Sequence, residues 1–329
     1  MGLWRNFLNI NIRLVLGGGR GGGTLRSGCN SKIGYVCGIS AAFFWGFHAV
    51  LARHLISELP GLVIAVIRLY VAVIGIYIFL KVFDPDLQTV KIRNPLLVFT
   101  AIFGMALNFL FFHLGLEYTT ASNAMLIESS APIFVLIFTV IFLKTKINTL
   151  NVFAIFMAFA GVLLVVIGDL DINKKQMFGD ILEMLAAITW AVFIIGSSRL
   201  VSLSLFPKKR MAYLMTVFII AAVPLTPVLF VMDYHISMLS LLYLVILGLL
   251  PTALAYALWY EAAAQISVVS AALIFNLSII FTLLNAHFIL GEAITLLMIL
   301  GALLIIGGVV LSQIAEDRNV DRVKIQAQS

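Results

Sequence analysis

Charged residues are scarce in this sequence. Asp, Glu, Lys and Arg make up 11% of its 329 residues, while hydrophobic residues make up 62%. Soluble globular domains carry about 25% charged and about 45–50% apolar residues, so the composition excludes an ordinary soluble domain. The apolar runs are continuous rather than alternating, which argues against a transmembrane β-barrel. The class that remains is an all-α polytopic membrane protein.

Cysteines are few, and the common nucleotide and metal motifs are missing. Cys29 lies in a glycine-rich stretch and Cys37 in the first apolar segment, which excludes a disulfide framework and a paired-cysteine metal site. The sequence contains no Walker A motif, Rossmann fingerprint, HExxH, GxSxG or EF-hand loop. We therefore expect no cofactor, no metal and no ATP-driven activity from this chain alone. The net charge of +6 comes from basic residues scattered between apolar segments, so we expect no nucleic-acid partner.

Ten apolar segments follow the N-terminal region. Each approaches the roughly 20 residues that cross a bilayer core, and the short loops between them hold most of the charge. Residues 1–32 are predicted as a flexible cytoplasmic tail, and residues 315–329 as a C-terminal cytoplasmic tail. The predicted spans are residues 33–55, 60–83, 95–116, 122–143, 150–168, 179–200, 211–232, 239–260, 267–290 and 294–314.

The basic residues predict the orientation in the membrane. If the N-terminus lies in the cytoplasm, 17 of the 21 Lys and Arg residues fall on the cytoplasmic side. Arg53, Lys174 and Lys175 fall on the outer side, and Arg68 falls inside a span. By the positive-inside rule, we expect a multi-pass protein of the plasma (inner) membrane with both termini cytoplasmic.

An internal repeat is visible at an offset of about 145 residues, where Trp45 falls on Trp190 and Ser122 falls on Ser267. Each unit holds five spans, so the second unit must be inverted in the membrane. The predicted domains are a first five-helix repeat at residues 33–168 and a second at residues 179–314. Inverted repeats of this kind enclose a central site near the bilayer midplane.

Three stretches resemble a known family: SAAFFWGFHAVLARH at residues 40–54, GLEYTTASNAMLIESSAPIF at 115–134 and FILGEAITLLMILGALLIIGGVVL at 288–311. Together with the five-plus-five spans, they look like the EamA type of the drug/metabolite transporter superfamily. The resemblance implies a ten-helix basket whose central cavity is lined mainly by spans 1, 3, 4, 6, 8 and 9. It also implies export or import of small metabolites, amino acids among them. Trp45 stands where small multidrug members have a proton-exchanging glutamate, so their coupling mechanism does not carry over.

Four ionisable residues lie inside spans at similar depth: His48, Arg68, Glu128 and Glu183. A charged side chain at the bilayer centre costs about 2.5–3.5 kcal/mol on insertion scales, so such residues should face protein or water. We predict that Glu128, His48 and Arg68 bind substrate, with Glu128 and His48 as candidates for coupling to a proton or another ion. The alternative is a structural ion pair between Arg68 and Glu128 with a hydrogen-bonded histidine. Glu183 is interpreted as favouring the N-terminus of its helix.

Aromatic and amide residues complete the predicted substrate site. Trp45 and Trp190 occupy equivalent points of the two repeats, so symmetry predicts them on opposite sides of the cavity, and Tyr256 lies on span 8. Asn108 and Asn276 are candidates to bond substrate or other helices. Aromatic residues in spans also serve as core packing or as anchors at the membrane interface.

Pro132 and Pro251 lie inside spans 4 and 8. Pro132 removes the N–H that would bond the carbonyl of Glu128. Both prolines are predicted hinges between inward-open and outward-open states, and static kinks are the alternative. His113 is expected near an outer helix end, at the membrane interface.

The predicted function is secondary transport of a small organic metabolite by alternating access, with an amino acid or a related solute favoured and no enzyme activity. The alternatives are a membrane-embedded enzyme with His48 and Glu128 as its acid–base pair, and a channel or sensor. The expected partners are the small-molecule substrate and the lipid bilayer. A monomer and a homodimer both fit.

Overall fold

The computed structural model describes residues 31–83, 94–143, 149–167, 174–202, 207–290 and 295–328, and no strand occurs among them. Residues 1–30 of the predicted N-terminal tail lie outside this described part. In chain order, with η marking a π-helix, the elements are α3 (Ser31–Ile56), α4 (Gly61–Phe83), α5 (Pro95–Phe99), η1 (Thr100–Ala106), α6 (Leu107–Tyr118), α7 (Ala121–Glu128), α8 (Ala131–Leu143), α9 (Thr149–Ile167), α10 (Lys174–Ser202), α11 (Pro207–Leu225), α12 (Val228–Val231), α13 (Met238–Gly248), η2 (Leu249–Leu254), α14 (Ala255–Gln265), α15 (Val268–Phe275), α16 (Leu277–Asn285), η3 (Ala286–Leu290) and α17 (Leu296–Gln328).

The helices confirm the all-α polytopic membrane fold, because the described residues hold seven stretches long and apolar enough to cross a membrane and three shorter apolar helices. The seven are Lys32–Ile56, Gly61–Val82, Pro95–Tyr118, Gln176–Val201, Lys209–Val231, Met238–Gln265 and Val268–Ile289. The three shorter ones are Ala131–Ile141, Thr149–Gly161 and Leu296–Ser312. The last helix differs from the prediction, because α17 continues as a helix to Gln328, beyond the predicted end of the span at residue 314.

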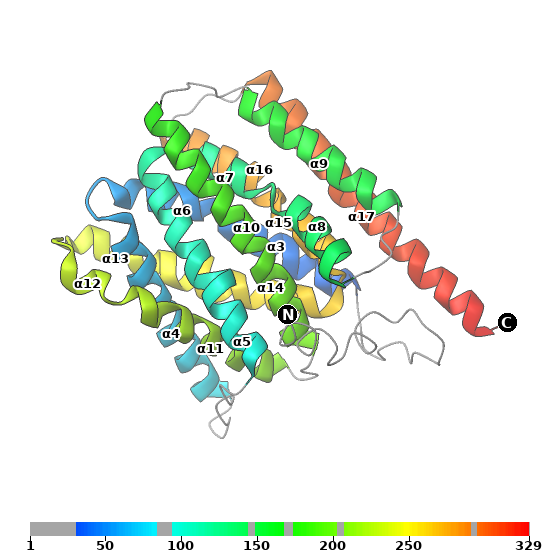
Figure 1. Cartoon of the computed structure of the whole chain (residues 1–329), viewed down its shortest axis with the longest axis horizontal. Coiled ribbons are helices and arrows are strands. Elements are labelled where there is room, and N and C mark those ends of the chain that lie inside the picture. The colour runs from blue at the N-terminus through cyan, green and yellow to red at the C-terminus, as the bar shows by residue number, and fades with distance from the viewer. Residues whose placement is uncertain are drawn as a thin grey trace.

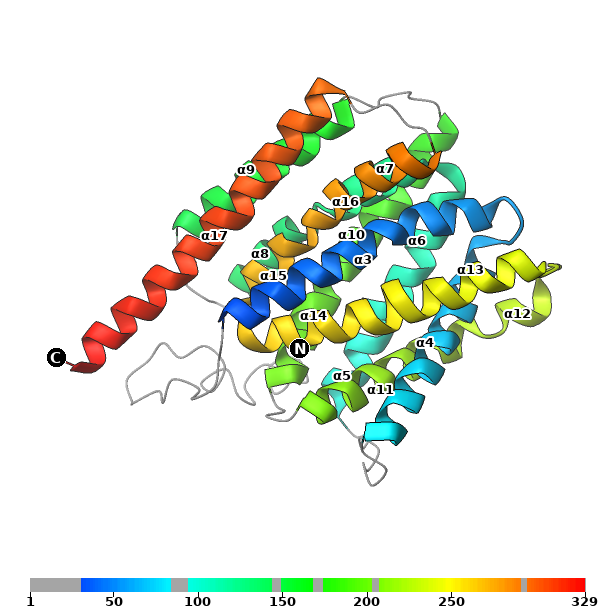
Figure 2. The same cartoon turned by 180° about the vertical axis from the view of Figure 1, so that it is seen from behind.

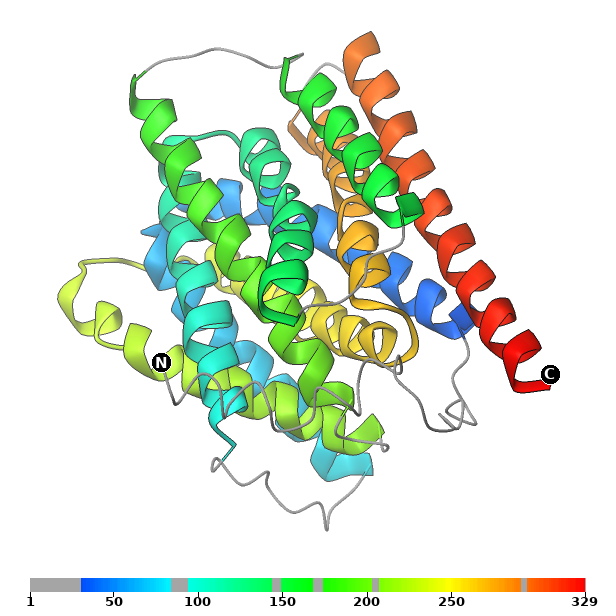
Figure 3. The same cartoon turned by 45° about the vertical axis from the view of Figure 1, so that its right-hand side comes forward.

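The two five-helix halves exchange their first helices. From the first half, α3 packs against α14, α15 and α16, while α10 of the second half packs against η1, α6, α7 and α8. Equivalent helices also pair with each other, α4 with α11 and α9 with α17. Figures 1 and 2 show the α9–α17 pair along one edge of the bundle, and in Figure 3 this pair runs along the right-hand side. This reciprocal packing fits an inverted repeat and brings the middles of α3 and α10 to the centre.

Two glycines permit this close packing of the first helices. A Cβ added to Gly46 of α3 would lie 2.3 Å from the Cβ of Phe281 on α16. A Cβ added to Gly104 of η1 would lie 2.8 Å from the Cα of Phe193 on α10. Small residues at such crossings let helix backbones approach closely, which is how helices in lipid gain packing energy.

The fourth span of each half is broken rather than continuous. The predicted span at 122–143 is divided into α7 and α8 by Ser129 and Ser130, directly after Glu128. The two serine hydroxyls donate to the carbonyls of Met125 and Ile127, at 2.6 and 2.7 Å. The backbone N–H groups of the same serines donate to these two carbonyls as well, at 3.0 Å each, so both acceptors are satisfied where the helix is interrupted, as lipid requires.

The second half has a matching break at Asn276, between α15 and α16, without a proline beside it. A break at this place in the repeat therefore does not require a proline, and its position follows the repeat.

The α3–α4 connection, the α6–α7 connection and the start of α10 meet at one end of the bundle, here termed the predicted outer end. The backbone N–H of Gly61, which begins α4, donates to Glu117 Oε1 near the end of α6 at 2.6 Å. The hydroxyl of Thr119 donates to Asp180 Oδ1 on α10 at 2.8 Å. The α3–α4 and α6–α7 connections and the first turns of α10 therefore lie at the same end, as alternating spans require.

Candidate functional site

A small cavity lies at the centre of the bundle, and seven of the eight predicted substrate-site residues line it. Its volume is about 10 Å³, room for about one water molecule, whereas pockets for small organic ligands measure about 300–1,000 Å³. Asn276 does not line this cavity. The lining residues are Trp45, His48, Arg68, Asn108, Phe109, Phe112, His113, Met125, Glu128, Trp190, Tyr256 and Phe275.

Arg68 of α4 is the cation of this cavity, and its side chain is only 1% exposed. Its Nε donates to the hydroxyl of Thr252 at 3.0 Å. Its Nη1 donates to Nε2 of His48 and, at 3.4 Å, to Nε2 of His113. The guanidinium also stacks over the ring of Phe109, with its carbon 4.6 Å from the ring centroid, a cation–π geometry.

These contacts determine the charge of the two imidazoles. Arginine has donors and no acceptor, so Nε2 of both His48 and His113 must present a lone pair, and both rings are neutral. The other nitrogen of His113, Nδ1, donates to the carbonyl of Phe109 at 2.9 Å. Among the described residues no carboxylate forms a salt bridge with Arg68. The predicted structural ion pair with Glu128 is therefore not formed, because neutral acceptors surround the guanidinium.

The π-helix η2 places Thr252 against Arg68. Pro251 has no N–H, so it cannot bond the carbonyl of Leu247 four residues earlier, as an α-helix would require. The hydroxyl of Thr252 donates to that carbonyl instead, at 2.7 Å, which leaves the hydroxyl oxygen to accept from Arg68. Pro251 lies in the irregular turn η2, and this turn positions a ligand of the buried cation.

Glu128 is the last residue of α7, and the break after it places the carboxyl at the cavity rather than in lipid. The side chain is 5% exposed. The Nδ2 group of Asn108 on α6 donates to Glu128 Oε1 at 2.8 Å and to the carbonyl of Ala186 on α10 at 3.1 Å. One amide thus joins the acidic residue to the first helix of the second half.

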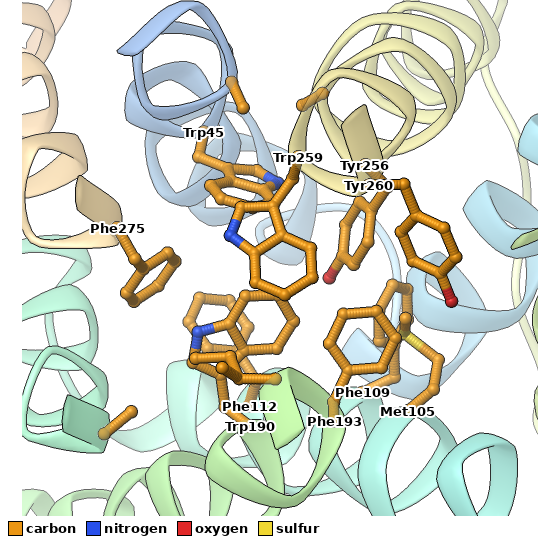
Figure 4. Packing of buried hydrophobic residues seen from close by; sticks show 14 of the residues in the cluster. Trp45, Met105, Phe109, Phe112, Trp190, Phe193, Tyr256, Trp259, Tyr260 and Phe275 are labelled. Atoms are coloured by element: carbon orange, nitrogen blue, oxygen red, sulfur yellow. The ribbon is translucent and has the colours of Figure 1, made fainter. Parts of the chain in front are cut away.

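The two twinned tryptophans meet instead of facing each other across an open space. The ring centroids of Trp45 and Trp190 are 5.5 Å apart and the rings are edge to face. Tyr256 lies 5.3 Å from the first and 5.7 Å from the second, and Phe275 contacts both. Figure 4 shows these rings pointing toward one another from several helices. The aromatic side chains therefore fill most of the centre.

Several site predictions need correction. His113, expected at the membrane interface, is buried at the cavity beside Arg68. Asn276 is buried at the helix break, and its Oδ1 has no hydrogen-bond partner among the described residues. Glu183 does not sit at an exposed helix start but is fully buried. Sequence reasoning also missed Thr252 and the cavity residues Phe109, Phe112, Met125 and Phe275.

The chemistry of the site resembles a binding site more than a catalytic centre. His48 bonds Arg68, and Glu128 bonds Asn108. Within the described part of the chain, no hydrogen bond joins His48 to Glu128, the acid and base of the enzyme alternative. No cluster of three His, Cys, Asp or Glu residues that could hold a metal ion occurs in that part either. What the site offers is one cation, one carboxyl and an aromatic enclosure.

Comparisons with known proteins bear on the family and the fold of this chain. The model of the EamA-like transporter family matches residues 32–167 and 177–313. An uncharacterized transporter of Archaeoglobus fulgidus is 30% identical over 220 residues, which cover 64% of this chain and 73% of that protein. The uncharacterized transporter YoaV of Bacillus subtilis is 25% identical over 285 residues, 82% of this chain and 93% of the relative. A solved crystal structure at 16% identity, with a TM-score of 0.68, covers 87% of this chain and 98% of that chain and shows the fold alone.

Proposed function

The chain belongs to the EamA-like transporter family, and we propose that it is a secondary transporter of a small organic metabolite that carries a carboxylate, with amino acids as the favoured class. The observation behind this proposal is Arg68, a buried cation whose hydrogen bonds all go to neutral acceptors. Glu128 lines the same cavity but forms no salt bridge with Arg68 among the described residues, and a buried charge without a directly paired counterion is costly. A substrate carboxylate would offset this cost through a bidentate, charge-assisted hydrogen bond.

The other groups of the cavity fit a zwitterion. Glu128 is the complementary carboxyl, and a substrate ammonium group would pair with it. The indole Nε1 of Trp190 is a buried donor without a partner among the described residues, so it is available to a substrate oxygen. The rings of Trp45 and Tyr256 would pack on the apolar part of the solute, in the manner of most small-molecule sites.

Alternating access supplies the room that the cavity lacks. At about 10 Å³ the centre cannot hold a metabolite, so the halves must separate to admit one. The irregular elements beside the cavity are the breaks after Glu128 and at Asn276 and the π-helix that holds Pro251. We propose that these elements take up the change in backbone conformation. We also propose that the protein lies in the plasma membrane with both chain termini in the cytoplasm.

Exchange of labelled amino acids in liposomes tests the proposal. Arg68→Lys keeps the charge but loses the fork of donors. Since a hydrogen bond to a charged group contributes about 1.5–3 kcal/mol, exchange should fall about tenfold or more. Arg53→Lys is the matched control, because Arg53 bonds the carbonyl of Leu116 outside the cavity, at 2.8 Å, and its exchange should stay near that of wild type.

Two results would contradict the proposal. If the Arg68→Lys protein exchanged every carboxylate-bearing solute at the rate of wild type, the guanidinium would have no role in binding the substrate carboxylate. Mass spectrometry of the solute after exchange should return the compound unchanged, and a chemically altered product would favour the enzyme alternative.

A further inference from the structure

Glu183 on α10 is a carboxyl that the proposed substrate site does not use. It is 0% exposed, and neither of its oxygens has a hydrogen-bond partner among the described residues. It packs against α6 at Gly115, where an added Cβ would lie 2.5 Å from Glu183 Oε1. The glycine therefore makes the space that the carboxyl occupies.

The surroundings of this carboxyl oppose a negative charge. Its electrostatic neighbours are Asp180 on the same helix and Glu128 on α7, and both are carboxyls. From α6, Glu117 bonds the backbone of α4 and His113 bonds Arg68, so neither serves as its partner.

An ionised carboxylate buried without a partner or a cation is far more costly than the neutral acid. The arrangement is therefore suited to a carboxylic acid that keeps its proton.

The location of Glu183 connects the predicted outer end with the cavity. Asp180, three residues earlier on α10, bonds Thr119 at that end. Ala186, three residues later, accepts from the Asn108 amide that also holds Glu128. Each step is about 4.5 Å along a helix, so the carboxyl lies one turn from each polar pair.

We propose that Glu183 is a proton-binding site that couples proton movement to transport. This inference rests on the proposed transport function. The carboxyl holds its proton while α6 and α10 are packed together. When the α6–α10 interface opens, the carboxylic O–H bond breaks, water accepts the proton, and a hydrated carboxylate remains. Glu128 and His48, the coupling candidates from the sequence, each already have a polar partner, whereas Glu183 has none among the described residues.

Proton binding can be tested without knowledge of the substrate. The full chain in detergent is unfolded at a series of values between about pH 7 and pH 9, where a carboxyl in the unfolded chain is ionised and the imidazoles of His48 and His113 are largely neutral in both states. One proton held only by the folded protein changes the unfolding constant about tenfold per pH unit. We expect stability to fall with rising pH in wild type, and Glu183→Gln to lose up to one proton of this slope. Asp180→Asn is the control and should keep it.

A second variant covers the case in which the amide does not fold. Removing a buried, unpartnered polar group should be tolerated or stabilising, so Glu183→Leu should fold and show the same flattened slope. An unchanged slope in either variant, or failure of both variants to fold, would overturn the assignment of a neutral, unpartnered acid. A slope that depends on sodium rather than on protons would overturn it as well.

Coupling itself is measured with a pH-sensitive dye trapped in liposomes while a mixture of amino acids is added outside. Wild type should move protons together with solute, and Glu183→Gln should retain exchange of labelled solute but not proton movement. If wild type exchanges solute without moving protons, coupling is refuted and transport stands. If wild type moves no solute, the proposed transport function fails, and the unfolding slopes still decide whether Glu183 holds a proton.

Discussion

Asn108 holds the Glu128 carboxyl at the cavity, and we expect Asn108→Leu to weaken this link measurably. Both hydrogens of its Nδ2 are used, one toward Glu128 Oε1 at 2.8 Å and one toward the Ala186 carbonyl at 3.1 Å. Leucine is close in shape but has no donor. The Ala186 carbonyl keeps the hydroxyl of Thr189 at 2.9 Å, so the larger loss falls on Glu128.

Measured hydrogen bonds between membrane helices set the expected magnitude. Double-mutant cycles average about 0.6 kcal/mol, with a maximum of about 1.7. A bond to an ionised group is roughly twice as strong as a neutral one. We therefore expect a coupling free energy of about 1–1.5 kcal/mol between Asn108 and Glu128, or about a tenfold change in the unfolding constant.

The assay is a cycle of Asn108→Leu, Glu128→Leu and the double variant, with the free energy of unfolding measured by titrating mixed micelles with a denaturing detergent. Glu128→Gln is the matched control, because it keeps an acceptor oxygen without the charge, and its coupling to Asn108→Leu should be about half as large. A coupling below about 0.3 kcal/mol, the usual limit of additivity, would refute the conclusion that Asn108 positions the carboxyl.

Two further predictions concern other parts of the bundle. Gly46→Ala places a Cβ 2.3 Å from that of Phe281 and should lower the free energy of unfolding by about 1–3 kcal/mol. Gly75→Ala is the control and should be tolerated, because its Cβ first meets the end of a leucine side chain. Equal losses of unfolding free energy in the two variants would contradict this. The hydrogen bond from Ser240 lowers the pKa of the exposed Glu58, so its stabilisation is present above the unfolded value of about 4.3 and is lost as pH falls through the lower folded value. The thermal stability of Ser240→Ala should therefore fall less on acidification than that of wild type. Identical dependences of the unfolding temperature on pH would contradict this.

Much of the fold could be predicted because lipid restricts the possible structures. A run of about 20 apolar residues in a bilayer must satisfy its own backbone, so it forms a helix. The helix breaks could not be predicted in the same way. Pro132 indicated a kink in the span at 122–143, but α7 ends before the proline, and the matching break at Asn276 has no proline near it. A break that follows the packing of the repeat leaves little trace in local residue types.

The sequence predicts which charged residues lie at the site, because a charge in lipid is costly. It does not predict which residues form hydrogen bonds with them. Arg68 and Glu128 could be placed at the centre, because neither is tolerated in lipid. The same rule applied to His113 would have found it as well. Their partners depend on side-chain directions across helices, so the expected ion pair gave way to neutral acceptors. Thr252 carried no signal of its own, since its role comes from the carbonyl that Pro251 leaves free.

The irregular helices follow the repeat, and the charges do not. Both halves have a π-helix in the third span and a break in the fourth. At the offset of about 145 residues, His48 falls on Phe193, Arg68 on Tyr213 and Glu128 on Leu273. In the proposed alternating-access cycle, a motion built on matched breaks would let the halves exchange roles at similar cost. These three ionisable groups lie on helices of the first half and would stay there in both states of that cycle, so we infer that symmetry supplies the motion while unmatched residues supply recognition.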